Sequence, residues 1–270
     1  MVGRKGRRFL SLPVVAVIAL MGFVHYFTVY VFIEDWLSLG SSAGFYNALV
    51  FSFLALMSLA SFFAAVLVDP GHVPASFVPD TEGSQGNGVR LKYCDRCCSY
   101  KPPRSHHCRV CRMCVLKMDH HCLWINNCVG YANYKPFVIF VLYASSSSIY
   151  SMVMFVCSTL QNDHKFIGRA SLEYFHVAYG SIIIILSMLL GTLLGWHIYL
   201  LSRNMTTIEY REGVRAMWLA RKSGQSYHHL FDRGMHKNLT SILGPNVLKW
   251  FCPLALGHLR DGTQFPIYQE

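Results

Sequence analysis

Charge is what this sequence has least of. Asp, Glu, Lys and Arg make up 14% of its 270 residues, whereas they make up about 25% of an ordinary globular protein. Apolar residues account for 53% of the chain. So little charge argues against a soluble protein and directs attention to membrane-spanning segments.

Charged residues are missing altogether from four long apolar runs, at residues 10–33, 45–68, 137–160 and 177–201. About 20 apolar residues are enough to cross the hydrocarbon core as a helix. Four such runs predict a multi-pass membrane protein rather than a single buried helix. The first run is longer than a signal-peptide core and has no small-residue cleavage site, so we expect it to be retained as a helix.

A channel or transporter would carry charged side chains near the middle of its spans. Here the spans contain no Asp, Glu, Lys or Arg, and His25 and His197 are their only histidines. This pattern disfavours an ion or solute pathway.

Acidic residues are also few, with 14 Asp and Glu against 24 Lys and Arg. Four of the basic residues precede the first run, nine lie in residues 69–136 and nine follow residue 201, but the connector at Glu34 and Asp35 has none. The positive-inside rule therefore places the N-terminus, the long middle loop and the C-terminal tail in the cytosol. The net charge of +10 then needs no nucleic acid as a partner, because the lipid bilayer surface attracts it.

Together with the cysteine-rich sequence considered next, these patterns predict an all-α membrane protein with four transmembrane helices and a cytosolic cysteine-rich domain, stapled by zinc, between the second and third helices. The expected divisions are residues 1–68, 69–136, 137–201 and 202–270.

Cysteine is concentrated in residues 91–136, which hold eight of the ten cysteines. Disulfides are disfavoured because cytosolic thiols stay reduced. The pairs Cys94/Cys97 and Cys108/Cys111 have the Cys-x2-Cys spacing of structural zinc sites. Two tetrahedral sites need eight ligands, and the cysteines and histidines together exceed that number. At least one thiol is therefore expected to remain without a metal.

Cys122 is the candidate for that free thiol, because His120 stands two residues before it. In an extended segment, residues two apart face the same side, so His120 could meet Cys122 while His121 turns to a zinc. Equally, all three side chains could be metal ligands. The spacing by itself does not decide between the two arrangements.

The string Asp119-His120-His121-Cys122 in this cysteine-rich frame resembles the DHHC family of protein S-acyltransferases, also called palmitoyltransferases. Further stretches carry the resemblance along the chain, at residues 69–71, 101–104, 124–130, 133–137, 206–209 and 231–238. In the last of these the family usually has Tyr where Phe231 stands. Residues 195–199 and 206–220 look most like plant members.

The resemblance implies two interleaved Cys3His zinc sites. The first would use Cys94, Cys97, His107 and Cys114, and the second would use Cys108, Cys111, His121 and Cys128. Cys98 is left over as a bystander. Both zincs are expected to be structural, since four protein ligands leave no open position for water.

The resemblance also implies an enzyme that moves a long-chain acyl group, mainly palmitoyl, from acyl-CoA to cysteines of membrane-associated proteins. Cys122 would carry the acyl group, His120 would take its thiol proton, and Asp119 would orient His120. A regular strand, however, would aim Asp119 away from His120, so the backbone must turn there or Asp119 must act through another group. The competing hypothesis is a zinc-binding membrane adaptor without enzymatic activity.

Other side chains are expected to meet acyl-CoA. Lys101, Arg104 and Arg109 are candidates for its phosphates, although each could equally be a solvated positive-inside charge. Trp124 is expected at the mouth of an acyl cavity or as an interfacial anchor. Ser147, in the third span, is expected to leave room for the end of the acyl chain.

The tail is expected to dock against the catalytic loop through Thr206, Thr207 and Asn238. By analogy with the plant members, the expected address is the endomembrane system, with the Golgi as first choice.

Overall fold

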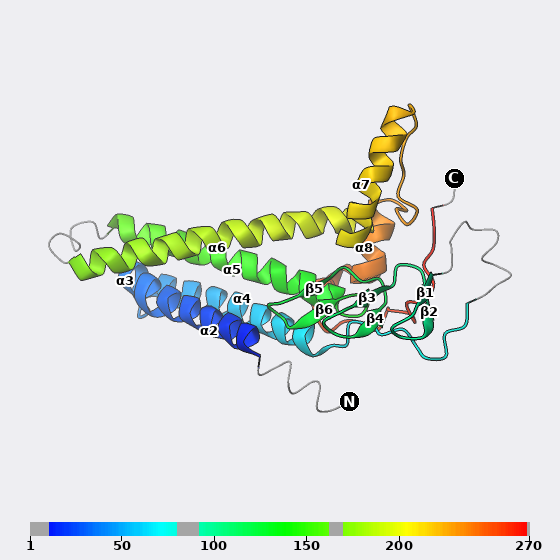
Figure 1. The fold of residues 1–270 in the computed structure, drawn as a ribbon. Coiled ribbons are helices and arrows are strands. Elements are labelled where there is room, and N and C mark those ends of the chain that lie inside the picture. Colours follow the sequence, from blue (N-terminus) through cyan, green and yellow to red (C-terminus); the bar gives the residue numbers. More distant parts are fainter. Residues whose placement is uncertain (1–10, 80–91, 162–169, 269–270) are drawn as a thin grey trace.

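The structure, a computed structural model, describes residues 11–79, 92–161 and 170–268. The basic segment that precedes the first apolar run lies outside these residues. Four helical segments in the described part of the chain are long and apolar enough to cross a membrane, which confirms the predicted number of spans. They lie side by side as one elongated bundle (Figure 1).

The first span runs continuously through α2 (Leu12–Phe27), the π-helical η1 (Thr28–Ile33) and α3 (Glu34–Leu37). The other three spans are formed by α4 (Ser42–Leu67), α5 (Tyr134–Gln161) and α6 (Ala170–Ser202). The four apolar runs form continuous helices for two reasons. None has a Pro in its middle, and in hydrocarbon the backbone must form its hydrogen bonds internally.

The prediction that Glu34 and Asp35 form a connector is wrong. Both residues belong to α3, the last turn of the first span. Both carboxylates have polar partners there: Glu34 accepts the N–H of Leu39, just beyond the helix, at 2.6 Å, and the Ser158 hydroxyl of α5 donates to Asp35 at 3.1 Å. The chain turns only at Ser38, whose φ of 54° ends the helix.

Two clusters of buried apolar side chains hold the bundle together. One lies at the end where α2 begins and α4 ends, and includes Val14, Phe62 and Phe137. The other lies towards the opposite end and includes Phe32, Phe51 and Tyr179. The first cluster also takes in Ile125 from the cysteine-rich segment, so bundle and segment share one core.

The cysteine-rich segment folds into three separate antiparallel hairpins at that end of the bundle (Figure 1). Their strands are β1 (Lys92–Cys94) with β2 (Ser99–Lys101), β3 (His106–Cys108) with β4 (Met113–Val115), and β5 (His120–Cys122) with β6 (Asn127–Val129). Strands of three residues cannot bury a core of their own, so this module needs another source of stability.

Polar side chains fasten the module to the end of α4. The amide of Asn127 donates to the carbonyl oxygens of Ala65, Val66 and Val68 at 3.1–3.3 Å. Asn133 donates to Ala65 O at 3.2 Å. The last carbonyls of a helix have no partner within the helix, so these amides complete the end of α4 and fix the third hairpin on it.

The tail contains α7 (Thr207–Lys222), α8 (Met235–Leu243) and the short η3 (Val247–Lys249). In Figure 1, α7 stands away from the bundle and runs across its long direction, whereas α8 returns to the bundle end. Asn238 of α8 donates to Ser202 O, at the end of α6, at 2.8 Å. The start of α2, the module and the tail thus share one end of the bundle, as expected if they face one compartment.

Candidate functional site

The three hairpins bring together two sets of four ligand-type side chains, the same two sets that the resemblance implies. Each set joins a Cys-x2-Cys turn to a histidine and a cysteine that face each other across a hairpin. In the first set that cross-strand pair is His107 with Cys114, and in the second it is His121 with Cys128. Because each Cys-x2-Cys turn belongs to the hairpin before, the two sets interleave along the chain.

The spacing within each set fits zinc. In the first set the three cysteine sulfurs lie 3.2–3.8 Å from His107 Nδ1, and in the second they lie 3.5–3.7 Å from His121 Nδ1. A tetrahedral ion with Zn–S of about 2.3 Å and Zn–N of about 2.0–2.1 Å separates sulfur from nitrogen by about 3.5 Å. Three thiolates and an imidazole are also the donors that zinc prefers.

Cys98 belongs to neither set. It is exposed, and it directly follows Cys97 as Arg112 follows Cys111. Both Cys98 and Arg112 have positive φ, at 49° and 54°. The two residues therefore occupy the same place in two equivalent turns, where the backbone conformation and not the side chain matters, and Cys98 has the bystander position expected of it.

Cys122 is also outside both sets, and its surroundings differ from those of Cys98. It ends β5, is partly buried, and packs against the apolar cluster at the end of the bundle where α2 begins. The turn that follows exposes Leu123 and Trp124, the latter by 58%. The thiol therefore stands where the module meets the membrane-spanning helices.

Asp119 and His120 contact each other directly, which resolves the conflict raised by strand geometry. β5 begins at His120, so Asp119 lies before the strand and its side chain is free to turn back. His120 Nδ1 lies 2.6 Å from Asp119 Oδ2. Asp119 is buried, whereas His120 keeps some exposure.

The electrostatics of the three residues favour charge separation. Burial would lower the pKa of His120, but hydrogen bonds with Asp119 and Cys122 outweigh burial and raise that pKa to about 9. Burial would raise the pKa of the Cys122 thiol, but the hydrogen bond with His120 and nearby backbone N–H groups lower it. Burial likewise opposes ionisation of Asp119, and its bond with His120 lowers the pKa of the carboxyl group. A thiolate beside an imidazolium is the arrangement of an activated nucleophile.

The first turn of α7 holds Asp119 from its other side. Thr207 donates its backbone N–H to Asp119 Oδ1 at 2.8 Å and its hydroxyl to Asp119 Oδ2 at 2.9 Å. Thr206 forms a capping box with Glu209, which starts α7 at this place. The tail is therefore more than a docked structural element, because it orients the carboxylate that orients His120.

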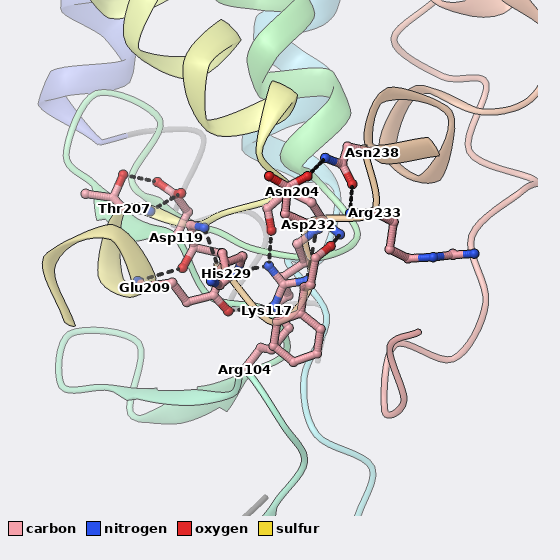
Figure 2. A network of polar contacts seen from close by, with 12 residues as sticks. Arg104, Lys117, Asp119, Asn204, Thr207, Glu209, His229, Asp232, Arg233 and Asn238 are labelled. Atoms are coloured by element: carbon pink, nitrogen blue, oxygen red, sulfur yellow. Dashed lines mark hydrogen bonds and ion pairs between the residues drawn. The ribbon is translucent and has the colours of Figure 1, made fainter. Parts of the chain in front are cut away.

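Arg104 is not placed to meet a phosphate, contrary to expectation. Its guanidinium group is buried and donates to both carboxylate oxygens of Glu209, at 2.6 and 2.7 Å, and to Asn204 O at 2.6 Å (Figure 2). The ring of Phe231 lies 4.3 Å from it. Glu209 fixes the start of α7, so this ion pair supports the contact of α7 with Asp119. Phe231 can stand here in place of the family's usual Tyr, because the contact with Arg104 uses only the face of the ring and needs no hydroxyl.

Two residues of this network, Asn204 and Lys117, were not foreseen. The buried Lys117 ammonium donates to Asn204 Oδ1 at 2.7 Å, and Asn204 Nδ2 donates to Phe231 O at 2.9 Å. Asn204 has a φ of 49°, a conformation that Asn tolerates better than most residues. An Asn directly after a long apolar run and before the Thr206 cap was the one available signal.

Arg104→Met is expected to destabilise the protein by about 3–5 kcal/mol, because it takes the guanidinium partner away from the buried Glu209 carboxylate. Thermal unfolding in detergent would measure the loss. Arg104→Met with Glu209→Met should recover part of it, since the carboxylate that lost its guanidinium partner is then also removed. An Arg104→Met protein as stable as the parent would contradict a structural role for the pair.

His197 is a further neighbour of His120 that sequence reasoning did not assign. It is buried near the end of α6, and its Nδ1 lies 3.1 Å from the hydroxyl of Tyr134. Its ring centroid lies 6.1 Å from that of His120, and Phe137 lies against both rings. These aromatic side chains confine the His120 ring on the side of the bundle.

The remaining candidates are scattered. Lys101 ends β2 and Arg109 is exposed in the turn after β3. Ser147 is buried in α5, and its hydroxyl has no hydrogen-bond partner among the described residues. The structure thus assembles Asp119, His120 and Cys122 in one place, whereas the candidates for acyl-CoA contacts lie on different elements of the fold.

Comparison with known proteins gives a consistent result. Residues 88–214 match the family model for DHHC palmitoyltransferases. "Probable protein S-acyltransferase 15" of Arabidopsis thaliana is 58% identical over 248 residues, which cover 91% of this chain and 98% of that protein. "Probable protein S-acyltransferase 16" of the same plant is 49% identical over 97% of this chain and 94% of its own. Human "Palmitoyltransferase ZDHHC2" is 37% identical over 65% of this chain and 46% of its own. With motif order, ligand sets and these relatives in agreement, the chain belongs to the DHHC palmitoyltransferase family.

Proposed function

We propose that this protein is a protein-cysteine S-acyltransferase that uses Cys122 to pass a long-chain acyl group, mainly palmitoyl, from acyl-CoA to cysteines of other proteins. The observation that carries the proposal is geometric. Cys122 lies outside both metal-ligand sets, beside a histidine whose other ring nitrogen is 2.6 Å from a buried carboxylate. The names of the relatives favour this enzyme over a zinc-binding adaptor.

The first step exchanges one thioester for another. The Cys122 sulfur attacks the acyl carbonyl carbon, the bond from that carbon to the CoA sulfur breaks, and the departing thiolate takes the proton held by His120. In the second step a substrate thiol gives its proton to His120 and attacks the acyl-Cys122 carbonyl, which returns Cys122 to its starting form. Asp119 stabilises the imidazolium in both steps and keeps the ring in place. No ATP is needed, because each step forms the kind of bond that it breaks.

The two ligand sets would hold structural zinc ions that cross-link the module. Four protein donors at each ion leave no position for water, so this chain's own side chains do the chemistry. The proposed partners are acyl-CoA, cysteine-containing membrane-associated proteins and the bilayer. Lys101 and Arg109 remain our proposed contacts for CoA phosphates, and Trp124, exposed beside Cys122, remains a proposed contact near the acyl chain.

The adaptor hypothesis makes a different prediction for acyl label. An acyltransferase incubated with radiolabelled palmitoyl-CoA should acquire a hydroxylamine-sensitive label on the purified protein. A correctly folded preparation with two zincs and no such label would favour the adaptor.

Thr207→Val is expected to slow autoacylation about tenfold, because it removes one hydrogen bond to the ionised Asp119 carboxylate and leaves the backbone N–H contact. Rates would be compared with Thr207→Ser, which keeps the hydroxyl and should retain most activity. Thr240→Val provides a matched control, since the Thr240 hydroxyl bonds only to backbone of its own α8. Equal rates for Thr207→Val and Thr207→Ser would remove this hydroxyl from the mechanism.

Ser147→Tyr is expected to shift the preference of the enzyme towards shorter acyl chains. Ser147 lies ten residues beyond Phe137, or about 15 Å along α5, near the depth that a palmitoyl chain reaches. We expect the parent enzyme to accept stearoyl as well as palmitoyl chains. Competition between acyl-CoAs of different lengths for Cys122 measures the shift. An unchanged profile in a folded Ser147→Tyr protein would place the chain elsewhere.

We also propose that the module and both termini face the cytosol and that the protein resides in the endomembrane system, at the Golgi. The distribution of Lys and Arg supports the orientation, and analogy alone supports the compartment. Imaging of a tagged protein against compartment markers tests the address, and protease access to tags at the two ends in sealed vesicles tests the orientation.

A further inference from the structure

The catalytic arrangement does not explain the outer part of α7. Beyond the buried Glu209, this helix carries one acidic residue, Glu212, against the four basic residues Arg211, Arg215, Arg221 and Lys222. All four basic side chains are exposed. Trp218 is exposed by 56%, and Lys222 Nζ lies 4.4 Å from the centre of its ring. A helix this basic, with an uncovered tryptophan, needs a partner that is both anionic and apolar.

The first turn shows which side of α7 faces the membrane-spanning helices. Tyr210 packs edge-on against Trp196 and Tyr199, which stack on each other near the end of α6. Trp and Tyr gather at the membrane–water interface, so this aromatic group marks the depth at which α7 starts.

Helical periodicity carries the same side along α7. At 100° per residue, the apolar residues Val214 and Met217 follow Tyr210 on one row, which ends at Arg221, and Trp218 lies at the edge of the row. The exposed Val214 thus continues the aromatic group outwards. Since α7 runs across the long direction of the bundle (Figure 1), this row lies along the plane of the membrane and not along its normal.

Three of the four basic residues occupy the adjoining face. Arg211, Arg215 and Lys222 recur at helical spacing beside the Trp218 edge. Within the described part of the chain, none of the three forms an ion pair with a carboxylate. An apolar row edged by tryptophan and bordered by cations is the pattern of a helix that lies in the bilayer interface.

We infer that α7 is an interfacial helix that binds the anionic bilayer surface on the side of the cysteine-rich module. Its apolar row enters the interface, and Arg211, Arg215 and Lys222 meet lipid phosphate and carboxylate groups. The contact fixes the outer end of the helix whose first turn holds Asp119. This inference requires only the membrane spans and does not depend on acyl transfer.

Hydrogen exchange on the full-length protein tests the inference. The protein would be reconstituted into vesicles of phosphatidylcholine alone or with about one third phosphatidylserine. Amides of residues 211–222 are expected to exchange at least about tenfold more slowly in the anionic vesicles, since each basic residue near such a surface strengthens binding about fivefold. Raising the salt to about 0.5 M should remove the difference in the unmodified protein, because it shortens the Debye length to a few ångströms.

The triple variant R211Q/R215Q/K222Q should lose the slowing, and the matched variant K237Q/R260Q, which neutralises exposed charges elsewhere in the tail, should keep it. Equal exchange in the two kinds of vesicle would overturn the inference. Slowing that occurs only when a substrate protein is added would also overturn it and make α7 a protein-docking helix. Autoacylation in the same vesicles keeps the two proposals apart, since slowed exchange without acylation leaves the membrane contact standing.

Discussion

Cys122→Ser is expected to abolish both autoacylation and transfer to a substrate, while the protein keeps about two zinc ions. Serine has nearly the shape of cysteine, but its hydroxyl is a far weaker nucleophile at neutral pH than a thiol activated by His120. Because Cys122 lies outside both ligand sets, metal binding should be unaffected. Acyl label on the purified protein and zinc by elemental analysis measure the two properties on one sample.

Cys252→Ser serves as the control for this experiment, since Cys252 is exposed in the tail and belongs to neither ligand set. It should retain acyl label at Cys122. Loss of a full equivalent of zinc in Cys122→Ser would make Cys122 a ligand, and the proposed mechanism would then fail.

His121→Ala is expected to lose one zinc and much of the stability of the protein, whereas His120→Ala should keep both zincs and lose activity. The two residues are neighbours, but the His121 ring nitrogen lies 3.5–3.7 Å from three cysteine sulfurs and the His120 ring nitrogen lies 2.6 Å from Asp119. Structural zinc contributes roughly 10–16 kcal/mol of apparent binding energy in small modules. Removing a general base typically costs about 10²–10⁴-fold in rate. Zinc content, thermal unfolding and acylation rate together separate the two variants.

The module makes this contrast sharp. Each of its strands has three residues, too few to hold a hairpin in register without the metal, so a lost ligand should unfold the hairpins that share it. If both histidine variants had the same zinc content, the division between ligand and base would be wrong. The Thr207→Val variant gives a second test of the division between ligand and base. Thr207 contacts Asp119 and neither ligand set, so this variant should lose rate and keep both zincs.

The linear order of residues was enough to predict the four spans and the position of the module. Span prediction works because hydrocarbon leaves the backbone no partner but itself, so an apolar run that crosses it must be helical. The ligand sets followed from the resemblance, and the structure gathers the same eight side chains. Charge alone misplaced the end of the first span, since Glu34 and Asp35 are helical and the Glu34 carboxylate accepts the N–H of Leu39 in the turn that follows.

Distant contacts decided the rest. Strand geometry left open how Asp119 could reach His120, and the answer depends on where β5 begins and on Thr207, 88 residues away. From the sequence, Arg104 was a candidate for a CoA phosphate or a solvated charge. In the structure it is buried in an ion pair with Glu209, 105 residues away. A side chain's residue type states what it can bind, but burial and partners determine what it does bind, and those arise only when segments far apart in sequence pack together.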